Sequence, residues 1–300
     1  MVEGYLTTDD GVRLFYRKAG TGPSVVLVPN GIYLFDDFAP LATNRTIIFY
    51  DVRNRGRSDH VDEPAKIARG IHHDVDDVDA VRRQFSAGTV DLIGHSYAGV
   101  TVALYAMKYA GGARRVVQIG AMGPDATKQY PPELMNADAT SRDVFTKLAE
   151  LQKERSALDP VEFCARFWSV LRALYVVDRA NVERIKWSRC ELSNERNFMK
   201  YWMGSLLPSI QRLQIAPEEA ANAKAPVLVV HGAKDRSAPY GGGRDWAALL
   251  PDARLVTVGD GGHAPWIEAP DLVLDAIETF LGGQWPEAAE QVASGNRVIE

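Results

Sequence analysis

Ser96 lies at a break between two apolar runs, in the stretch VDLIGHSYAGVTVALYAM. This pattern predicts a buried strand, a tight turn that carries the serine, and a buried helix. Such a turn lifts the hydroxyl above the sheet and directs the free N–H groups of the helix start toward developing negative charge. Ala98 stands where a G-x-S-x-G turn has its second glycine, with Gly99 one place later. The stretch alone therefore leaves open whether Ser96 is a nucleophile or a serine in an ordinary turn.

A serine nucleophile needs a base, and the base needs an acid that orients it. His263 lies in GDGGHAPW, a glycine-rich loop between a predicted strand and the last predicted helix, and Asp235 follows another predicted strand in VLVVHGAKDRSAP. Loops at the carboxyl ends of strands carry the chemistry of open α/β sheets. The chain order Ser96, Asp235, His263 is that of a nucleophile-elbow triad. Asp125, which follows the strand predicted at 114–121, is the rival acid.

These residues require strands that end at one edge of a sheet. Short apolar runs alternate with helical patterns, which is typical of a mostly parallel sheet flanked by helices. The predicted strands are 5–7, 12–17, 24–28, 45–51, 90–94, 114–121, 225–232 and 253–260, and the predicted helices are 70–85, 97–109, 242–250 and 271–281. Between residues 125 and 220 the pattern is helical and aromatic. The predicted fold class is α/β, with a core made of residues 1–124 and 221–300 and a helical cap, or lid, at 125–220.

With these motifs in place, the chain resembles the α/β-hydrolase family over nearly its whole length. The matching segments are GHSYAG at the turn, HGAKDRSAP at the acid and GGHAPW at the histidine. The resemblance implies acyl transfer, in which Ser96 attacks a carbonyl, His263 acts as base and then as acid, and Asp235 holds the histidine in its working tautomer. It also implies an oxyanion hole made by the backbone N–H groups of Tyr97 and of Ile32 in the loop VPNGIYL.

One segment is typical of a branch within that family. YDVRNRGRSD at 50–59 is similar to the D-x-R-G-x-G-x-S segment of proline iminopeptidase-like hydrolases. The chain departs from those peptidases because it has no H-G-G-P-G near residue 30, and its turn is GHSYAG rather than GGSWGG. An aminopeptidase must also hold the substrate ammonium group with carboxylates. Glu191 and Glu195 are the candidates, although acids on a helix usually form a solvated face.

Aromatic residues of the predicted cap and of the loops near Ser96 could form an apolar substrate pocket. The candidate substrate-binding residues are Gly31, Tyr33, Phe167, Trp187 and Trp266. We expect a cofactor-free carboxylic ester hydrolase that acts on small to medium apolar substrates. The alternatives are an aminopeptidase of the iminopeptidase type and a non-enzymatic ligand receptor on the same fold. Lactone opening, carbon–carbon bond hydrolysis and perhydrolysis use the same three residues and stay open.

Two other patterns are not expected to bind a metal or a cofactor. HHDVDDVD at 72–79 contains metal-ligand residue types, but adjacent histidines point in different directions on a helix, so a solvated helix start is the expectation. GGG at 241–243 lacks the lysine of a phosphate-binding loop and is expected to be a flexible turn.

Composition sets the remaining expectations. The chain has 300 residues and a net charge of −5, which argues against nucleic acid or an anionic membrane as a partner and leaves a small molecule. No basic and apolar leader opens the sequence, and no apolar run is long enough to cross a membrane. Cys164 and Cys190 are expected to be reduced thiols in a cytoplasmic protein. The polar tail beyond Trp285 is expected to pack loosely.

Overall fold

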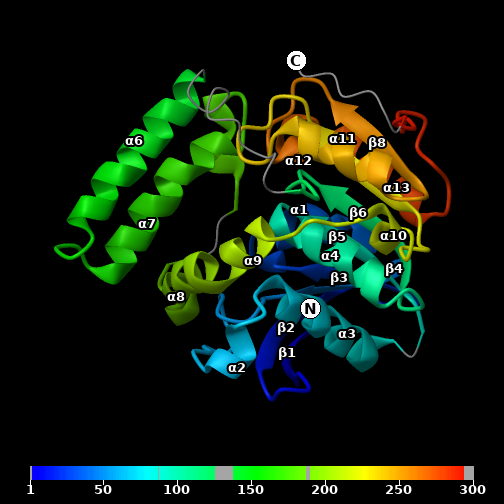
Figure 1. Ribbon diagram of the computed structural model, residues 1–300, viewed down its shortest axis with the longest axis horizontal. Helices are drawn as coiled ribbons and strands as arrows, with labels where there is room; N and C mark the ends of the chain where they lie inside the picture. Colours follow the sequence, from blue (N-terminus) through cyan, green and yellow to red (C-terminus); the bar gives the residue numbers. More distant parts are fainter. Residues whose placement is uncertain (1, 87, 126–137, 187–189, 294–300) are drawn as a thin grey trace.

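A sheet of eight strands forms the centre of the computed structural model, which describes residues 2–86, 88–125, 138–186 and 190–293 (Figure 1). The strands lie in the order β1-β2-β4-β3-β5-β6-β7-β8. Their bounds are β1 Val2–Thr7, β2 Arg13–Ala19, β3 Ser24–Pro29, β4 Arg45–Tyr50, β5 Val90–His95, β6 Ala113–Ile119, β7 Val227–Gly232 and β8 Ala253–Val258. β2 pairs antiparallel with β1 and β4, and all other neighbours are parallel. The predicted, mostly parallel sheet is confirmed.

The composition of the strands explains their place in the sheet. β4, β5 and β7 are buried along their whole length. Continuous apolar runs of this kind form strands whose two faces are both covered by helices. The predicted hairpin between β1 and β2 is also confirmed, and its turn contains Gly11 with a φ of 82°, a backbone conformation that glycine adopts without strain.

Helices cover both faces of the sheet. Their bounds are α1 Phe35–Phe38, α2 Pro64–Ile67, α3 Ile71–Phe85, α4 Tyr97–Lys108, α6 Ala139–Glu154, α7 Pro160–Leu171, α8 Ser193–Tyr201, α9 Leu207–Gln211, α10 Pro217–Ala220, α11 Tyr240–Leu249, α12 Pro265–Glu268 and α13 Pro270–Leu281. On one face, Val78 of α3, Val100 of α4 and Trp246 of α11 belong to one apolar cluster. On the other face, Phe38 of α1 and Ile277 of α13 belong to a second cluster.

Between β6 and β7 the described residues form helices α6 to α10 and one isolated bridge between Asp125 and Gln214. α6 and α7 form a pair of helices that extends from one side of the sheet (Figure 1). α8 leads through a π-helical segment, Trp202–Leu206, into α9, and it packs Phe198 into the same apolar cluster as α4. The proposed boundaries of a cap at residues 125 and 220 stay a prediction.

Cys164 of α7 and Cys190, which precedes α8, form a disulfide with a Cα–Cα distance of 5.8 Å. The expectation of reduced thiols is therefore wrong. The two cysteines are 26 residues apart, and the packing of α7 against α8 brings them together, which spacing alone could not show. Disulfides persist mainly in oxidising compartments, so the cytoplasmic expectation loses the support that it drew from reduced cysteines.

Two smaller expectations are also wrong. Residues 241–243 belong to the first turn of α11 instead of forming a flexible turn. The chain beyond Trp285 is ordered as far as it is described, because Leu255 and Glu290 exchange both backbone hydrogen bonds, at 2.8 and 2.9 Å, and Ala289 is buried. β8 is an edge strand, and its free backbone groups offer a place for the tail to pair.

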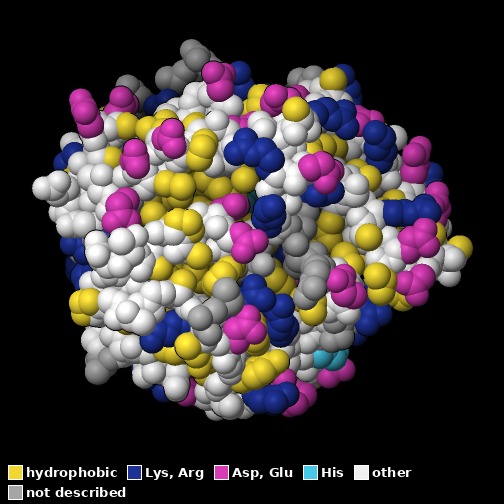
Figure 2. All heavy atoms as spheres, turned by 180° about the vertical axis from the view of Figure 1, so that it is seen from behind, with side chains coloured by type: hydrophobic (Ala, Val, Ile, Leu, Met, Phe, Trp, Pro, Cys, Tyr) yellow, Lys and Arg dark blue, Asp and Glu magenta, His cyan; other side chains and the backbone are white. Residues whose placement is uncertain are grey.

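Acidic and basic side chains are mixed over the face of the molecule seen in Figure 2, with apolar side chains between them. Mixed charges of this kind produce a weak field over the face, since neighbouring contributions of opposite sign cancel. Within the described ranges, no helix has the length and apolar character needed to cross a membrane.

Candidate active site

The carboxyl ends of β3 and β5 lie side by side where the sheet reverses its strand order. β3 pairs with β4 on one side and with β5 on the other. Open α/β sheets bind their ligands at such a point, beyond the carboxyl ends of the strands. β3 leads directly into Asn30, Gly31 and Ile32, and β5 leads directly into Ser96. The topology thus brings the predicted oxyanion loop next to the predicted nucleophile.

Ser96 has a strained backbone, with φ 59° and ψ −127°, and directly precedes α4. A Cβ added at Gly94 would lie 2.2 Å from the carbonyl oxygen of Ala98, and one added at Gly99 would lie 2.7 Å from Cβ of Ala121. Gly94 and Gly99 are therefore the positions where the close approach of strand and helix excludes a side chain, whereas the methyl group of Ala98 is accommodated. Strain of this kind in a residue other than glycine is typical of functional positions.

His263 and Asp235 form a hydrogen-bonded pair, in which Nδ1 of the histidine lies 2.8 Å from Oδ2 of the aspartate and both side chains are fully buried. Oδ1 of Asp235 accepts the backbone N–H groups of Ser237 and Ala238, each at 2.7 Å. Burial alone would raise the pKa of Asp235, but the attraction of His263 and hydrogen bonds from His231 and His263 hold that pKa well below its usual range. Asp235 is therefore ionised, and Nδ1 of His263 donates a proton to it.

With a proton on Nδ1 only, the ring of His263 has a second nitrogen, Nε2, that acts as an acceptor. This atom is buried and has no hydrogen-bond partner among the residues that the structure describes. A buried polar atom without a partner costs about 1–3 kcal/mol, so such an atom in a folded protein requires an explanation. An imidazole held in this tautomer, with a free acceptor nitrogen, is what a general base requires.

His231 is a second histidine beside Asp235, and the sequence interpretation did not include it. Its Nε2 lies 2.7 Å from the carbonyl oxygen of Ala238, to which it donates, and 3.3 Å from Oδ2 of Asp235. The histidine thus shares the carboxylate oxygen that His263 uses and helps to lower the pKa of Asp235. The spacing of four residues between His231 and Asp235, across a turn at the end of β7, is the signal that could have found this contact.

His95, directly before the serine, connects the loop after β3 with the loop that carries His263. The hydroxyl of Tyr33 lies 2.7 Å from Nδ1 of His95, and Nε2 of His95 lies 2.8 Å from the carbonyl oxygen of His263. Because a carbonyl only accepts, Nε2 carries the proton and Nδ1 accepts from Tyr33. Burial lowers the pKa of His95 well below its usual range, so the ring is neutral. Tyr33, a predicted pocket residue, uses its hydroxyl in this contact.

Ser96 and the histidine–aspartate pair each lie close to the chain at the end of β6. The N–H of Ser96 donates to the carbonyl of Ile119 at 3.0 Å, and the next residue, Gly120, has a φ of 50°. A Cβ added at Gly120 would lie 3.1 Å from Nδ1 of His263 and 3.2 Å from Oδ2 of Asp235. The rings of His95 and His263 are also 4.5 Å apart between centroids. Ser96 and the histidine–aspartate pair therefore both lie at the end of β6, and the acid hydrogen-bonded to the histidine is Asp235. The catalytic role of the three residues stays a prediction.

The predicted oxyanion loop is packed tightly on its neighbours. Asn30 has a left-handed φ of 57°, and a Cβ added at Gly31 would lie 2.8 Å from a side chain of β4. A Cβ added at Gly56 would lie 2.5 Å from Cδ1 of Ile32, so the loop rests on the segment that follows β4. Tyr97 is the first residue of α4, where a helix leaves its N–H groups without partners in its own backbone. The role of both N–H groups stays a prediction.

The remaining predicted pocket residues lie in different surroundings. Trp266 is buried, its indole N–H donates to Asp37 at 2.9 Å, and its ring centroid lies 4.8 Å from that of His95. Phe167 is half-buried and lines a cavity of about 150 Å³ at α7 and α8, together with Trp168. Trp187 lies outside the described residues.

Of the two acids considered for an ammonium group, Glu191 is exposed and Glu195 is fully buried. The expectation of a solvated face is therefore wrong for Glu195, whose Oε1 lies 3.1 Å from Nη2 of Arg55. No local pattern indicates this role of Arg55, because its partner is 140 residues away in the chain.

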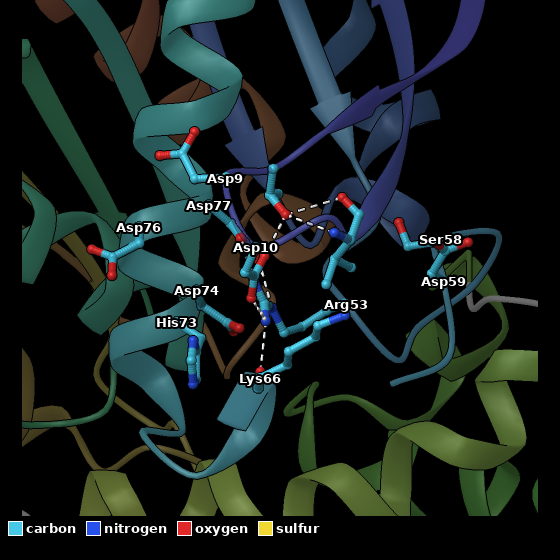
Figure 3. Close-up of polar contacts among 12 residues, drawn as sticks. Asp9, Asp10, Arg53, Ser58, Asp59, Lys66, His73, Asp74, Asp76 and Asp77 are labelled. Carbon is cyan, nitrogen blue, oxygen red and sulfur yellow. Dashed lines mark hydrogen bonds and ion pairs between the residues drawn. The ribbon is translucent and has the colours of Figure 1, made fainter. Parts of the chain in front are cut away.

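A second buried polar cluster lies between α3 and the segment after β4, as Figure 3 shows. Arg53 donates to Asp77 at 2.6 and 2.8 Å, to Asp10 at 2.9 Å and to the carbonyl of Lys66 at 2.6 Å. The expectation of a solvated helix start at 72–79 is therefore wrong. The buried residues of this segment include His73, Asp74 and Asp77. Within the described part of the chain, no three or more His, Cys, Asp or Glu residues are arranged to hold a metal ion.

Asp74 of this cluster makes stability depend on pH. Burial, reinforced by the nearby charge of Asp77, raises the pKa of Asp74 to about 8, although Arg53 and the hydroxyl of Tyr201 oppose the shift. Between about pH 4 and 8 the folded chain therefore holds a proton that the unfolded chain has released, and this contribution to the free energy of unfolding decreases as pH rises through that range. We expect Asp74→Asn to raise the melting temperature relative to wild type, by about 2–5 °C at pH 8 and by less at pH 5.

Thermal unfolding of both proteins at pH 5, 6.5 and 8 measures this difference. Asp76→Asn is a suitable comparison, because Asp76 is partly exposed and its pKa is lowered, mainly by hydrogen bonds from Lys108 and Arg69 that outweigh its partial burial. That variant is expected to lose stability at all three pH values. An Asp74→Asn protein whose melting temperature differs from wild type by the same amount at every pH would contradict the assignment.

A strained serine between strand and helix, together with a buried histidine–aspartate pair at the ends of later parallel strands, is typical of the class of α/β hydrolases. The chain belongs to the alpha/beta hydrolase fold family, whose model matches residues 25–270. It is 24% identical over 290 residues to a bifunctional esterase/perhydrolase of Acinetobacter calcoaceticus, covering 91% of this chain and 98% of that protein. It is 23% identical over 286 residues to the AB hydrolase superfamily protein YisY of Bacillus subtilis, covering 92% and 98%.

Solved structures show the same fold. A meta-cleavage product hydrolase from Pseudomonas fluorescens superposes with a TM-score of 0.71 at 18% identity, covering 93% of this chain and 97% of that one. An esterase from Exiguobacterium antarcticum has a TM-score of 0.71 at 13% identity, covering 94% and 100%. At these identities the likeness extends to the fold alone, so the reaction has to be argued from the site.

Proposed function

We propose that the protein is a serine hydrolase that cleaves carboxylic esters through Ser96, His263 and Asp235. The observation that carries the proposal is the state of His263. Its Nδ1 is bonded to an ionised carboxylate, while its buried Nε2 has no partner in the described part of the chain. Ser96 is strained, and its backbone N–H donates to the carbonyl of Ile119, directly before the Gly120 that lies against His263 and Asp235. A free acceptor nitrogen next to a serine hydroxyl is the pairing that activates the hydroxyl for attack.

The reaction follows from these positions in two halves. Nε2 of His263 takes the proton of Ser96 as Oγ attacks the ester carbonyl, and the N–H groups of Ile32 and Tyr97 bind the oxyanion. His263 then gives its proton to the departing alcohol, which leaves an acyl group on Ser96. A water molecule repeats the attack with the same base and releases the acid. Asp235 stabilises the imidazolium that forms in each half.

Ester cleavage is favoured over the other reactions of this triad by one sequence relative. The Acinetobacter calcoaceticus protein, whose alignment covers 91% of this chain, is named a bifunctional esterase/perhydrolase. A meta-cleavage product hydrolase from Pseudomonas fluorescens and an enol-lactonase from Burkholderia xenovorans share the fold. Carbon–carbon bond hydrolysis and lactone opening stay open for this chain. These reactions form the second group of candidates, because they would use the same serine and histidine.

An aminopeptidase is disfavoured by the surroundings of Glu195. A carboxylate that holds a substrate ammonium must face the substrate without another positive partner. Glu195 is buried and already makes two hydrogen bonds to Arg55, at 3.1 and 3.3 Å. An ammonium group would have to displace a guanidinium from this site.

The test is reaction with a fluorophosphonate probe and a substrate panel. We expect one equivalent of probe per chain, mapped by mass spectrometry to the peptide that contains Ser96, and turnover of p-nitrophenyl esters. Failure of the wild-type protein to react with the probe would contradict the proposal. Absence of turnover on esters, lactones and aminoacyl arylamides alike would favour a ligand receptor. Preferred cleavage of arylamides would favour the peptidase.

Gly120 provides a further test of the geometry. We expect Gly120→Ala to lower kcat by about 10- to 100-fold, because the new Cβ needs the space now next to His263 and Asp235 and its φ of 50° disfavours alanine. Ester turnover per probe-titrated site measures the effect. Gly111→Ala is the control, since a Cβ added there would meet nothing within 4 Å. Equal activity of both variants would show that the pair is not positioned by this contact.

A further inference from the structure

Arg55 is a buried cation that the proposed reaction does not use. It lies in the segment after β4, and 2% of its surface is exposed. Its guanidinium lies over three aromatic rings, at 4.3 Å from the ring centroid of Phe198, 5.3 Å from Tyr33 and 5.7 Å from Trp168. A charge in such apolar surroundings loses its hydration, and an apolar residue of similar size would often give equal stability. Stability is therefore a weak explanation for its presence.

On one side, Arg55 holds the predicted oxyanion loop. Nη1 donates to Oδ1 of Asn30 at 2.7 Å, and both residues are buried. Asn30 has the left-handed conformation that turns the chain from β3 into Gly31 and Ile32. Gly56, the neighbour of Arg55, lies against the side chain of Ile32. The segment after β4 therefore contacts the loop twice, next to the peptide whose N–H is proposed to bind the oxyanion.

On the other side, Arg55 is bound by α8 of the helical insertion. Nε and Nη2 donate to the two carboxylate oxygens of Glu195, at 3.3 and 3.1 Å, in a bidentate pair. The adjacent residue, Asn194, donates its amide to the carbonyl of Ser58 in the same segment. The start of α8 therefore binds the segment after β4 at two points. A planar guanidinium whose Nε and Nη2 are held by one carboxylate has its Nη1 fixed in direction, which a lysine could not reproduce.

We propose that Arg55 is a positioning residue for the oxyanion hole, held by Glu195 of α8 and acting through Asn30 on the N–H of Ile32. This inference rests on the proposed function, because it assigns the N–H of Ile32 to that reaction. The arrangement connects the helical insertion with the reacting centre through one continuous set of buried contacts. An α8 that is displaced would release Arg55 and leave one oxyanion donor poorly aimed.

The test compares Arg55→Met, Asn30→Gly and the double variant. Methionine removes the charge and its hydrogen bonds, and glycine keeps the left-handed backbone at residue 30 while it removes the acceptor. We expect each single variant to lower kcat per probe-titrated site by about 10- to 100-fold, below the 100- to 1,000-fold loss of a whole donor. KM is expected to change by less than about threefold. The kcat of the double variant is expected to be no lower than that of the less active single variant, because both substitutions act through one contact.

A boronic acid inhibitor separates positioning from a merely structural role. Its tetrahedral adduct with Ser96 needs the oxyanion donors, so its affinity is expected to fall in parallel with kcat in Arg55→Met, Asn30→Gly and Glu195→Gln. The control is Lys200→Gln, which removes an exposed charge from the same helix and is expected to match wild type.

The outcomes separate this inference from the function on which it rests. Variants with unchanged kcat per titrated site, or with unchanged boronic acid affinity, would overturn the positioning role while the wild type remains an active esterase. Losses that multiply in the double variant would also overturn it, because they would show that Arg55 and Asn30 act independently. A wild type that neither reacts with the probe nor turns over an ester would overturn both proposals.

Discussion

Replacing Ser96 by alanine is expected to lower kcat for a p-nitrophenyl ester by a factor on the order of 10⁶ and to abolish reaction with a fluorophosphonate. The hydroxyl is the only group that the substitution removes. Alanine has to adopt the backbone conformation that serine now holds, with a φ of 59°. Because the loop and the oxyanion donors remain, a small residual rate above that of water is expected. Steady-state kinetics and probe labelling at equal protein concentration measure both effects.

Ser156→Ala is the matched control for this variant. Ser156 is exposed in the turn after α6, so the substitution removes a hydroxyl far from any strained backbone and is expected to leave kcat unchanged. Circular dichroism and thermal unfolding establish that the Ser96 variant is folded. Labelling or turnover of Ser96→Ala at rates within tenfold of wild type would show that another residue is the nucleophile.

The sequence allowed the frame of the site to be predicted because that frame depends on local patterns. Strand–turn–helix signals place Ser96, Asp235 and His263 at the ends of parallel strands, and the carboxyl ends of parallel strands meet at one edge of a sheet. The spacing of glycines around Ser96 also indicated that Gly94 and Gly99 lie where the strand and the helix come close together. The methyl group of Ala98 raised a question that spacing could not decide, since only the path of the strand and helix shows which residue meets the other backbone.

The contacts that tune the site could not be predicted in the same way. Tyr33 reaches His95 across 62 residues, and Arg55 reaches Glu195 across 140. Such pairs depend on how the helical insertion and the loops pack on the sheet, and a single sequence contains no periodicity that records this. The rule that acids on a helix are solvated failed at Glu195 for the same reason, because the partner that makes burial possible lies in a distant segment.

Asp235→Asn is expected to lower kcat by about 10⁴-fold without unfolding the protein. The backbone N–H groups of Ser237 and Ala238 donate to Oδ1, so an asparagine here keeps its carbonyl oxygen at that position. Its NH₂ group then occupies the place of Oδ2, 2.8 Å from Nδ1 of His263, and can only donate. Nδ1 must therefore become the acceptor, and the proton moves to Nε2, which can no longer take the proton of the serine.

Asp260 provides the matched control for this variant. Asp260→Asn removes a carboxylate that is exposed and paired with Lys234 at 2.7 Å, three residues before His263, and it is expected to retain wild-type kcat. Probe labelling of Asp235→Asn should slow in parallel with kcat, since both reactions need the base, whereas its thermal unfolding should stay cooperative.

His231 also contacts Oδ2, at 3.3 Å, but its Nε2 donates to the carbonyl of Ala238 and cannot replace the lost acceptor. A kcat within tenfold of wild type would therefore mean that the tautomer of His263 is not set by Asp235, and the proposed triad would be wrong.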